Sequence, residues 1–159
     1  MILSAIVTDE YTPIVAGGHK VYPILLIEMT VNGTTVPLRA LLDTGSDGGV
    51  SLTINEVVAL DIDLGSPIDP IPHIAQIANN TEVEELDYSI EVEFNGLQQR
   101  IPTTLSVMGM RPTFTPMTER ERREAASKVV ALLGREVMDK YIVTFNDKAN
   151  PQKTFTFAD

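Results

Sequence analysis

The sequence predicts a single domain, residues 1–159, built mostly from antiparallel β-strands, with one or two short helices and an extra inserted helix. Three observations lead to this prediction. Apolar and polar residues alternate in several segments, as in half-buried strands. Asn-Gly dipeptides, which favour tight hairpin turns, follow two of these segments, and capping-box patterns mark the starts of two helices. A chain of 159 residues is long enough for one compact core and too short for two ordinary domains.

The first predicted hairpin covers residues 21–42. Residues 21–31 are largely apolar and predict a buried strand, and Asn32-Gly33 supplies the positive backbone angles of a tight turn. The returning segment alternates, with one face formed by Val36, Leu38, Ala40 and Leu42. This strand therefore ends directly before Asp43.

Short elements complete the expected fold. Thr53 and Glu56 have the spacing of a capping box, which predicts a short helix that ends at about Leu60. Residues 142–145 and 154–157 predict two closing strands, separated by a segment rich in turn-forming residues.

The second half of the chain repeats the pattern of the first. Residues 90–96 resemble residues 27–33, with the same Asn-Gly dipeptide closing an alternating segment. A Leu-Leu pair precedes both Asp43 and Gly134, so these two residues are expected at equivalent points of a degenerate duplication.

An insertion at residues 108–128 interrupts the second half. Thr118 and Glu121 form another capping box, which predicts a surface helix over residues 119–126. The run from Glu119 to Glu124 mixes charges of both signs, so we favour a solvated face with internal charge pairs over a binding patch.

Composition excludes several classes of function. The net charge of -10 argues against nucleic acid or an anionic membrane as the main partner, because both attract basic surfaces. The chain has no cysteine, which removes thiolate chemistry and cysteine-bound metals. No segment has the length of a membrane span and the first ten residues do not resemble a signal peptide, so we expect a cytoplasmic protein.

Asp43-Thr44-Gly45 is the strongest candidate for chemistry. It places a carboxylate at the end of an apolar strand, followed by a hydroxyl and a glycine. Carboxylates hydrolyse a peptide bond by activating water as a pair, one as the general base and the other as the general acid. Because the chain has only one such motif, the second Asp43 would come from another copy of the chain across a two-fold axis.

The surroundings of this motif extend the interpretation. The run from Leu41 to Asp47, with Val50 following, resembles the active-site segment of retropepsin-like aspartic proteases, and the run from Leu132 to Arg135 resembles the second signature of that family. Residues 138–145 also resemble the tail of its prokaryotic members. The resemblance implies a closed acid-protease barrel, a homodimer whose interface includes terminal strands, and peptide hydrolase activity without a cofactor.

The resemblance assigns roles to the residues of the first signature. Asp43 would be the catalytic carboxylate, and Thr44 would hydrogen-bond across the dimer axis. Gly45 would let the backbone pack against the carboxylate and donate to it. Ser46 follows the motif where some family members have alanine, and its position alone motivates the hypothesis that its hydroxyl hydrogen-bonds the outer oxygen of Asp43 and favours its charged form.

The resemblance also assigns a supporting pair. Asp47 would pair with Arg135, next to Gly134, and would also meet the backbone of bound peptide. A planar guanidinium holds a carboxylate through two hydrogen bonds, which would brace the active-site loop. The alternative is two exposed charges with no contact, and we favour the pair.

The sequence departs from the family in the hairpin flap that covers the cleft. The corresponding residues 72–87 have no glycine, although Asn79-Asn80 is able to form the turn between the two arms. Residues 82–93 hold six acidic residues and no basic one. We interpret them as a solvated strand face whose charge protects the sheet edge; the alternative is that they select basic substrates near the cleft. His73 and His19 are expected to be incidental, and since no histidine and carboxylate grouping has metal-ligand spacing, no metal is expected.

Three functions are compatible with these observations. The first is a homodimeric aspartic endopeptidase in which Asp43 of both protomers activates water. The second is a catalytically weak or inactive retropepsin-like module for peptide binding or dimerisation, which the glycine-free flap would explain. The third, a monomeric β-domain with an accidental motif, is the least favoured.

Overall fold

The computed structural model describes residues 6–12, 22–94, 97, 99–109, 117–146 and 154–158, with only the backbone described at residues 6–12, 78, 146 and 154. In these ranges the strands are β1 (Ile6–Thr12), β2 (Tyr22–Val31), β3 (Thr34–Leu42), β4 (Val50–Thr53), β5 (His73–Gln76), β6 (Glu82–Phe94), β7 (Arg100–Met108), β8 (Ala131–Leu133), β9 (Ile142–Asn146) and β10 (Thr154–Ala158). The helices are α1 (Ile54–Ala59), the single 3-10 turn η1 (Ala78–Asn80), α2 (Glu119–Ser127) and α3 (Arg135–Met138).

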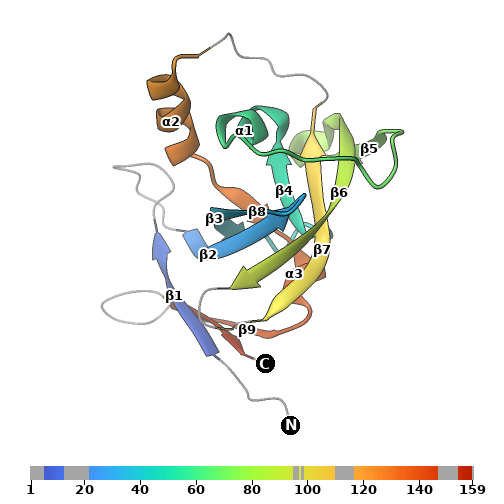
Figure 1. Cartoon of the computed structure of the whole chain (residues 1–159). Coiled ribbons are helices and arrows are strands. Elements are labelled where there is room, and N and C mark those ends of the chain that lie inside the picture. Colours follow the sequence, from blue (N-terminus) through green and yellow to red (C-terminus); the bar gives the residue numbers. More distant parts are fainter. Residues whose placement is uncertain are drawn as a thin grey trace.

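The strands form one sheet that returns on itself (Figure 1). Their order is β5-β6-β7-β4-β8-β3-β2-β1-β10-β9, and an additional pairing joins β6 to β2. That pairing makes a ring of neighbours from β6, β7, β4, β8, β3 and β2. The pairings are antiparallel except for β3 with β8 and β4 with β7. The prediction of a mostly antiparallel β-fold with a few short helices is therefore confirmed.

The first hairpin forms where the sequence predicts it. β2 pairs with β3 from Val31 opposite Thr34 to Ile24 opposite Leu41. Asn32 and Gly33 have φ values of 47° and 79°, the left-handed angles of a two-residue hairpin turn. Residues 95 and 96, the second Asn-Gly dipeptide, lie outside the described residues.

The duplication is present, but its two halves correspond differently from the prediction. The first half runs through β2, β3, β4 and α1, and the second through β6, β7, β8 and α3. Two parallel pairings join the halves: β3 pairs with β8, and β4 pairs with β7. Leu41 and Leu42 therefore lie beside Leu132 and Leu133 as partners in a ladder. The expectation that Asp43 and Gly134 occupy equivalent points is wrong, since β8 corresponds to β4.

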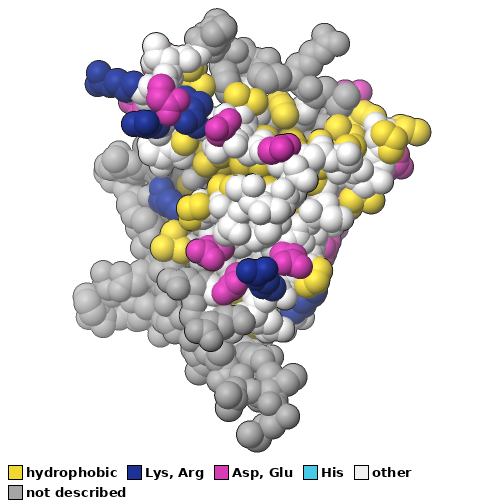
Figure 2. Space-filling model, in the orientation of Figure 1, with side chains coloured by type: hydrophobic (Ala, Val, Ile, Leu, Met, Phe, Trp, Pro, Cys, Tyr) yellow, Lys and Arg dark blue, Asp and Glu magenta, His cyan; other side chains and the backbone are white. Residues whose placement is uncertain are grey.

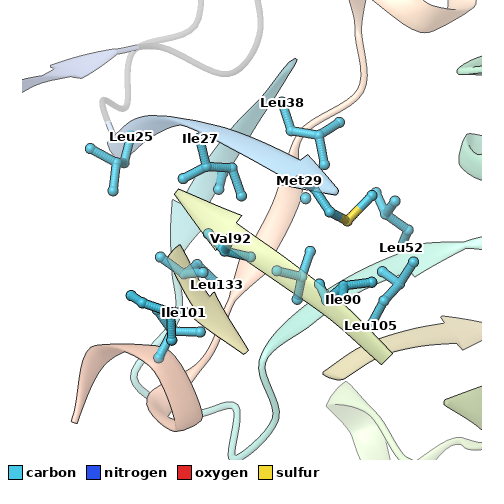
Figure 3. Close-up of a cluster of buried hydrophobic side chains, with 14 of the residues drawn as sticks. Leu25, Ile27, Met29, Leu38, Leu52, Ile90, Val92, Ile101, Leu105 and Leu133 are labelled. Carbon is cyan, nitrogen blue, oxygen red and sulfur yellow. The ribbon is translucent and has the colours of Figure 1, made fainter. Parts of the chain in front are cut away.

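Alternating apolar side chains fill the interior of the ring (Figure 3). Met29 of β2, Leu52 of β4, Val92 of β6 and Leu133 of β8 are all fully buried. Because buried side chains alternate along β3, β4 and β8, one face of each strand packs against this core, and the strand ends that carry the site are held in a fixed frame.

α2 forms in the insertion and covers α1 with its polar surface. Arg122 donates to the carbonyl oxygen of Ala59 at 3.2 Å, although no described side chain of α2 is buried. Arg122 and Arg123 both hydrogen-bond Glu119, and these bonds lower the pKa of the Glu119 carboxyl. The predicted internal charge pairing is confirmed, and Figure 2 shows the mixed charges gathered on this helix. Residues 110–116 of the insertion lie outside the described residues.

The two closing strands are also present. β9 and β10 pair with each other, and β10 pairs in addition with β1, so the two ends of the chain share one part of the sheet. Among the described residues, no helix combines the length and the apolar character that a membrane span requires.

Both predicted capping boxes are formed, and they allow a matched comparison. Thr53 and Thr118 each accept a hydrogen bond from a backbone N–H at 3.2 Å, but α1 buries Val57 and Ala59 whereas α2 buries nothing. We expect Thr53→Ala to lower the free energy of unfolding by about 1 kcal/mol. Thr118→Ala should have a smaller effect, since α2 contributes little to the cooperative core. Urea denaturation measures both, and an equal or larger effect of Thr118→Ala would contradict this account.

Candidate active site

The loop after β3 begins where two parallel strands run side by side. β3 ends at Leu42, and the backbone N–H of Asp43 continues the ladder by donating to the carbonyl oxygen of Leu133 at 3.0 Å. The start of the loop is therefore fixed by the sheet. Asp43 emerges at the end of the strand, as the sequence predicts.

The Asp43 carboxylate is oriented by its own loop. The backbone N–H of Gly45 donates to Asp43 Oδ1 at 3.0 Å, and the N–H of Ser46 donates to the Asp43 carbonyl oxygen at 3.2 Å. A Cβ atom at position 45 would lie 3.2 Å from Asp43 Oδ1, so glycine leaves the carboxylate accessible. Asp43 is half-buried, whereas Thr44 and Gly45 are exposed in the single chain.

The segment after β8 clamps the rest of the loop through backbone hydrogen bonds. Gly134, Arg135 and Glu136 donate from their N–H groups to loop carbonyl oxygens at 2.7, 2.8 and 3.2 Å. The acceptors are the carbonyl oxygens of Gly49, Ser46 and Gly48, in that order. The Glu136 carboxylate also accepts a hydrogen bond from Thr103 Oγ1 at 2.5 Å, which ties the clamp to β7.

This clamp requires a close approach of two backbones. A Cβ atom at Gly134 would lie 2.2 Å from the Gly48 carbonyl oxygen, and one at Gly49 would lie 2.3 Å from Thr103 Oγ1. Real Cβ contacts are never this short, so both positions exclude any side chain. The resemblance singles out Gly134 in the sequence, but Gly49, Thr103 and Glu136 were not predicted, because nothing local marks a contact between distant segments.

Asp47 and Arg135 lie together beside the clamp. The Arg135 guanidinium donates to Asp47 Oδ1, so the structure brings together the two side chains that the sequence analysis paired. The Asp47 side chain is 83% exposed and that of Arg135 is 50% exposed. An ion pair this exposed contributes little to stability, and its function as a brace stays a prediction.

The Ser46 hydroxyl lies close to Gly134. A Cβ atom at Gly134 would lie 2.9 Å from Ser46 Oγ, so the hydroxyl lies against the clamp. Its hydrogen bond to the outer oxygen of Asp43 stays a prediction.

A second group of polar side chains lies on the hairpin of β5 and β6. His73 Nε2 lies 3.1 Å from Glu85 Oε1 and 3.9 Å from Asp87 Oδ2, and Ser106 Oγ donates to Asp87 Oδ1 at 2.8 Å. The expectation of no metal rested on spacing along the chain, and the strand register brings together residues that this spacing separates. His19 lies outside the described residues.

Comparisons with known proteins find a similarity in structure. No protein-family model matches the sequence, and no curated protein matches it either. Among solved structures, the chain is similar to one described as EIAV protease complexed with the inhibitor HBY-793. The two are 21% identical, the alignment covers 75% of this chain and 86% of that chain, and the TM-score is 0.47. At these values the similarity carries no argument about function, and the assignments below rest on the residues of this chain.

Two glycines of the loop and clamp provide a test of the close approach. Gly134→Ala should lower the free energy of unfolding by about 1–3 kcal/mol, because the new methyl group would overlap the Gly48 carbonyl oxygen. Gly48→Ala is the control, since a Cβ atom there would meet only Ser106 Oγ, at 3.9 Å. Chemical denaturation compares the two variants. Equal stability of Gly134→Ala and the parent would show that the clamp does not need this contact.

Proposed function

We propose that the protein is a homodimeric aspartic endopeptidase of the retropepsin-like type, in which Asp43 of two protomers activates the attacking water. The observation that carries this proposal is the Asp43-Thr44-Gly45 loop, anchored to the sheet at Leu133 with its carboxylate held by Gly45. Membership of the prokaryotic branch of that family and a cytoplasmic location belong to the same proposal.

A single chain supports only half of this chemistry. The duplication places the end of β7, at Met108 and Gly109, at the position that corresponds to Asp43. From residue 101 to residue 118 the sequence contains no Asp or Glu. The second half of the fold therefore supplies no carboxylate at the matching strand end, and a two-fold dimer would supply it instead.

Exposed groups around the loop are consistent with such a dimer. Thr44 and Gly45 are solvent-accessible in the single chain although they follow directly after a carboxylate that the loop holds in place. β9, the last strand in the described sheet order, also presents Ile142 at 67% and Phe145 at 39% exposure. We propose that both surfaces are covered in the dimer, with Thr44 hydrogen-bonding across the axis.

The chemistry follows from the proximity of two carboxylates. Across a two-fold axis the two Asp43 side chains would share one proton, because a second negative charge is disfavoured beside the first. The ionised carboxylate would take a proton from water as that water attacks the peptide carbonyl carbon. The protonated carboxyl would donate to the carbonyl oxygen, and no covalent intermediate would form.

The hairpin over residues 72–87 is the proposed cover of the peptide site. Its tip turns through Asn79 and Asn80 with φ values of 66° and 57°, which supports the idea that asparagine replaces glycine there. Ile71, Ile74 and Ile77 are 74%, 59% and 41% exposed, so the hairpin offers apolar surface to the side chains of an extended peptide. Figure 2 shows apolar side chains gathered at the corner of the molecule where Figure 1 places β5.

Asp43→Asn tests the proposed catalyst. We expect cleavage of a mixed peptide library to fall by at least about a thousandfold, because an amide is unable to act as the general base. The far-ultraviolet spectrum and the molar mass by light scattering should stay those of the parent. Cleavage by the variant at the parental rate would rule out Asp43 as the catalyst.

The same measurements separate the remaining alternatives. A dimer that binds peptides without cleaving them would favour the peptide-binding module over the endopeptidase. A strict monomer under assay conditions would rule out the mechanism with two Asp43 residues.

Asp47→Asn tests whether the exposed ion pair matters more for activity than for stability. We expect a change in the free energy of unfolding below about 1 kcal/mol, as for other exposed ion pairs. The loss in kcat/KM should be larger, about tenfold or more, because Asp47 stands on the loop that carries Asp43. Arg135→Lys should show the same separation, since lysine lacks the planar fork. Equal kcat/KM for parent and Asp47→Asn would remove this residue from the site.

A further inference from the structure

We propose that His73, Glu85 and Asp87 form a binding site for a divalent transition-metal cation, with Zn²⁺ the best match, on the hairpin of β5 and β6. The three side chains offer one imidazole nitrogen and two carboxylate oxygens, all within 4.8 Å of one another. This grouping is the only one of its kind among the described residues. The site is separate from Asp43 and does not depend on its chemistry.

The strand register explains how these ligands converge. His73 of β5 lies directly opposite Glu85 of β6. Asp87 is two residues further along β6, so its side chain projects from the same face of the hairpin. One ligand from one strand and two alternate ligands from its neighbour form a triangle that a cation is able to bridge.

The distances fit a tetrahedral cation with small adjustments. Zn²⁺ binds imidazole nitrogen and carboxylate oxygen at about 2.0–2.2 Å, which places neighbouring ligand atoms about 3.4 Å apart. The observed separations from His73 Nε2 are 3.1 Å to Glu85 Oε1 and 3.9 Å to Asp87 Oδ2. They lie on either side of that value, so small rotations of the side chains would suffice. Water would fill the remaining coordination position.

A hydrogen bond from Ser106 orients the Asp87 carboxylate. Ser106 Oγ donates to Asp87 Oδ1 at 2.8 Å, which leaves Oδ2 directed toward His73. Ser106 is 8% exposed, so this bond is sheltered from water. Hydrogen bonds of this kind to ligating carboxylates raise metal affinity about 10–100-fold.

The exposure of the ligands suits a site that binds cations from solution. The side chain of His73 is 50% exposed, whereas those of Glu85 and Asp87 are 14% and 33% exposed. The imidazole is therefore accessible to an arriving ion, and the carboxylates are held nearer to the sheet. The mixture of one nitrogen and two oxygens favours Zn²⁺ over Mg²⁺ or Ca²⁺, which need more oxygen ligands.

The location gives the site a consequence for the hairpin. A cation would tie β5 to β6. Ser106, which hydrogen-bonds Asp87, lies near the active-site loop, since a Cβ atom at Gly48 would lie 3.9 Å from Ser106 Oγ. Bound Zn²⁺ would therefore slow the movement of the hairpin over Asp43. This consequence for peptide access rests on the proposed function, whereas the binding site itself does not.

Calorimetric titration of Zn²⁺ into the full Asp43→Asn chain tests the site without self-cleavage. We expect one Zn²⁺ per chain, with binding lost in His73→Gln and in Asp87→Asn and weakened about tenfold in Ser106→Ala. Glu84→Gln is the matched control, because it makes the same change of charge on the opposite face of β6 and should bind as the parent does. Mg²⁺ should give no binding.

Hydrogen exchange supplies a second readout. Zn²⁺ should slow amide exchange over residues 73–87 in the parent chain and leave it unchanged in His73→Gln. Absence of Zn²⁺ binding, equal binding by parent and His73→Gln, or equal weakening by Glu84→Gln would each overturn the site. Binding without slower exchange would overturn the link between the two arms. A cleaving enzyme that Zn²⁺ inhibits in the parent and not in His73→Gln would connect the site to peptide access.

Discussion

The close approach of the segment after β8 to the loop after β3 is the constraint on which the rest of the site depends. Three consecutive N–H groups, from Gly134 to Glu136, donate to carbonyl oxygens of that loop. Such a contact is possible only without a Cβ atom at Gly134, which would lie 2.2 Å from the Gly48 carbonyl oxygen. Backbone groups that satisfy each other hold their geometry without relying on long side chains. The position of Asp43 is therefore a property of the backbone.

This view also explains why the exposed ion pair beside the clamp is not the main support of the loop. The Asp47 and Arg135 side chains are largely in water, where a charge pair gains little free energy. The backbone clamp is shielded by the fully buried Leu133 and Val50, which face each other between β8 and β4. A dimer that covered Asp47 and Arg135 would remove water from the pair and strengthen it. The pair would then respond to dimerisation while the clamp would not.

The sequence predicts local structure well and long-range register poorly. The Asn32-Gly33 turn and the Thr53 capping box depend on residues a few positions apart, so the sequence predicts both. The correspondence of the two halves depends on which strands pair, and the Leu-Leu pairs suggested equivalence where the sheet makes them partners. Gly49 and Thr103 carried no local signal, because their contact joins residues more than fifty positions apart.

The group formed by His73, Glu85 and Asp87 also depends on strand register, so the sequence did not predict it. The charges of this group explain why a cation would bind there. Glu85 and Asp87 place two negative charges on one face of β6 in a chain with a net charge of -10. Without a cation, a hydrogen bond from a half-exposed imidazole and one from Ser106 hold these carboxylates. An exposed contact of that kind contributes at most about 1 kcal/mol. A cation would replace a weak cross-strand contact with direct coordination, so the stiffness of the hairpin would follow the cation concentration while the clamped loop stayed unchanged.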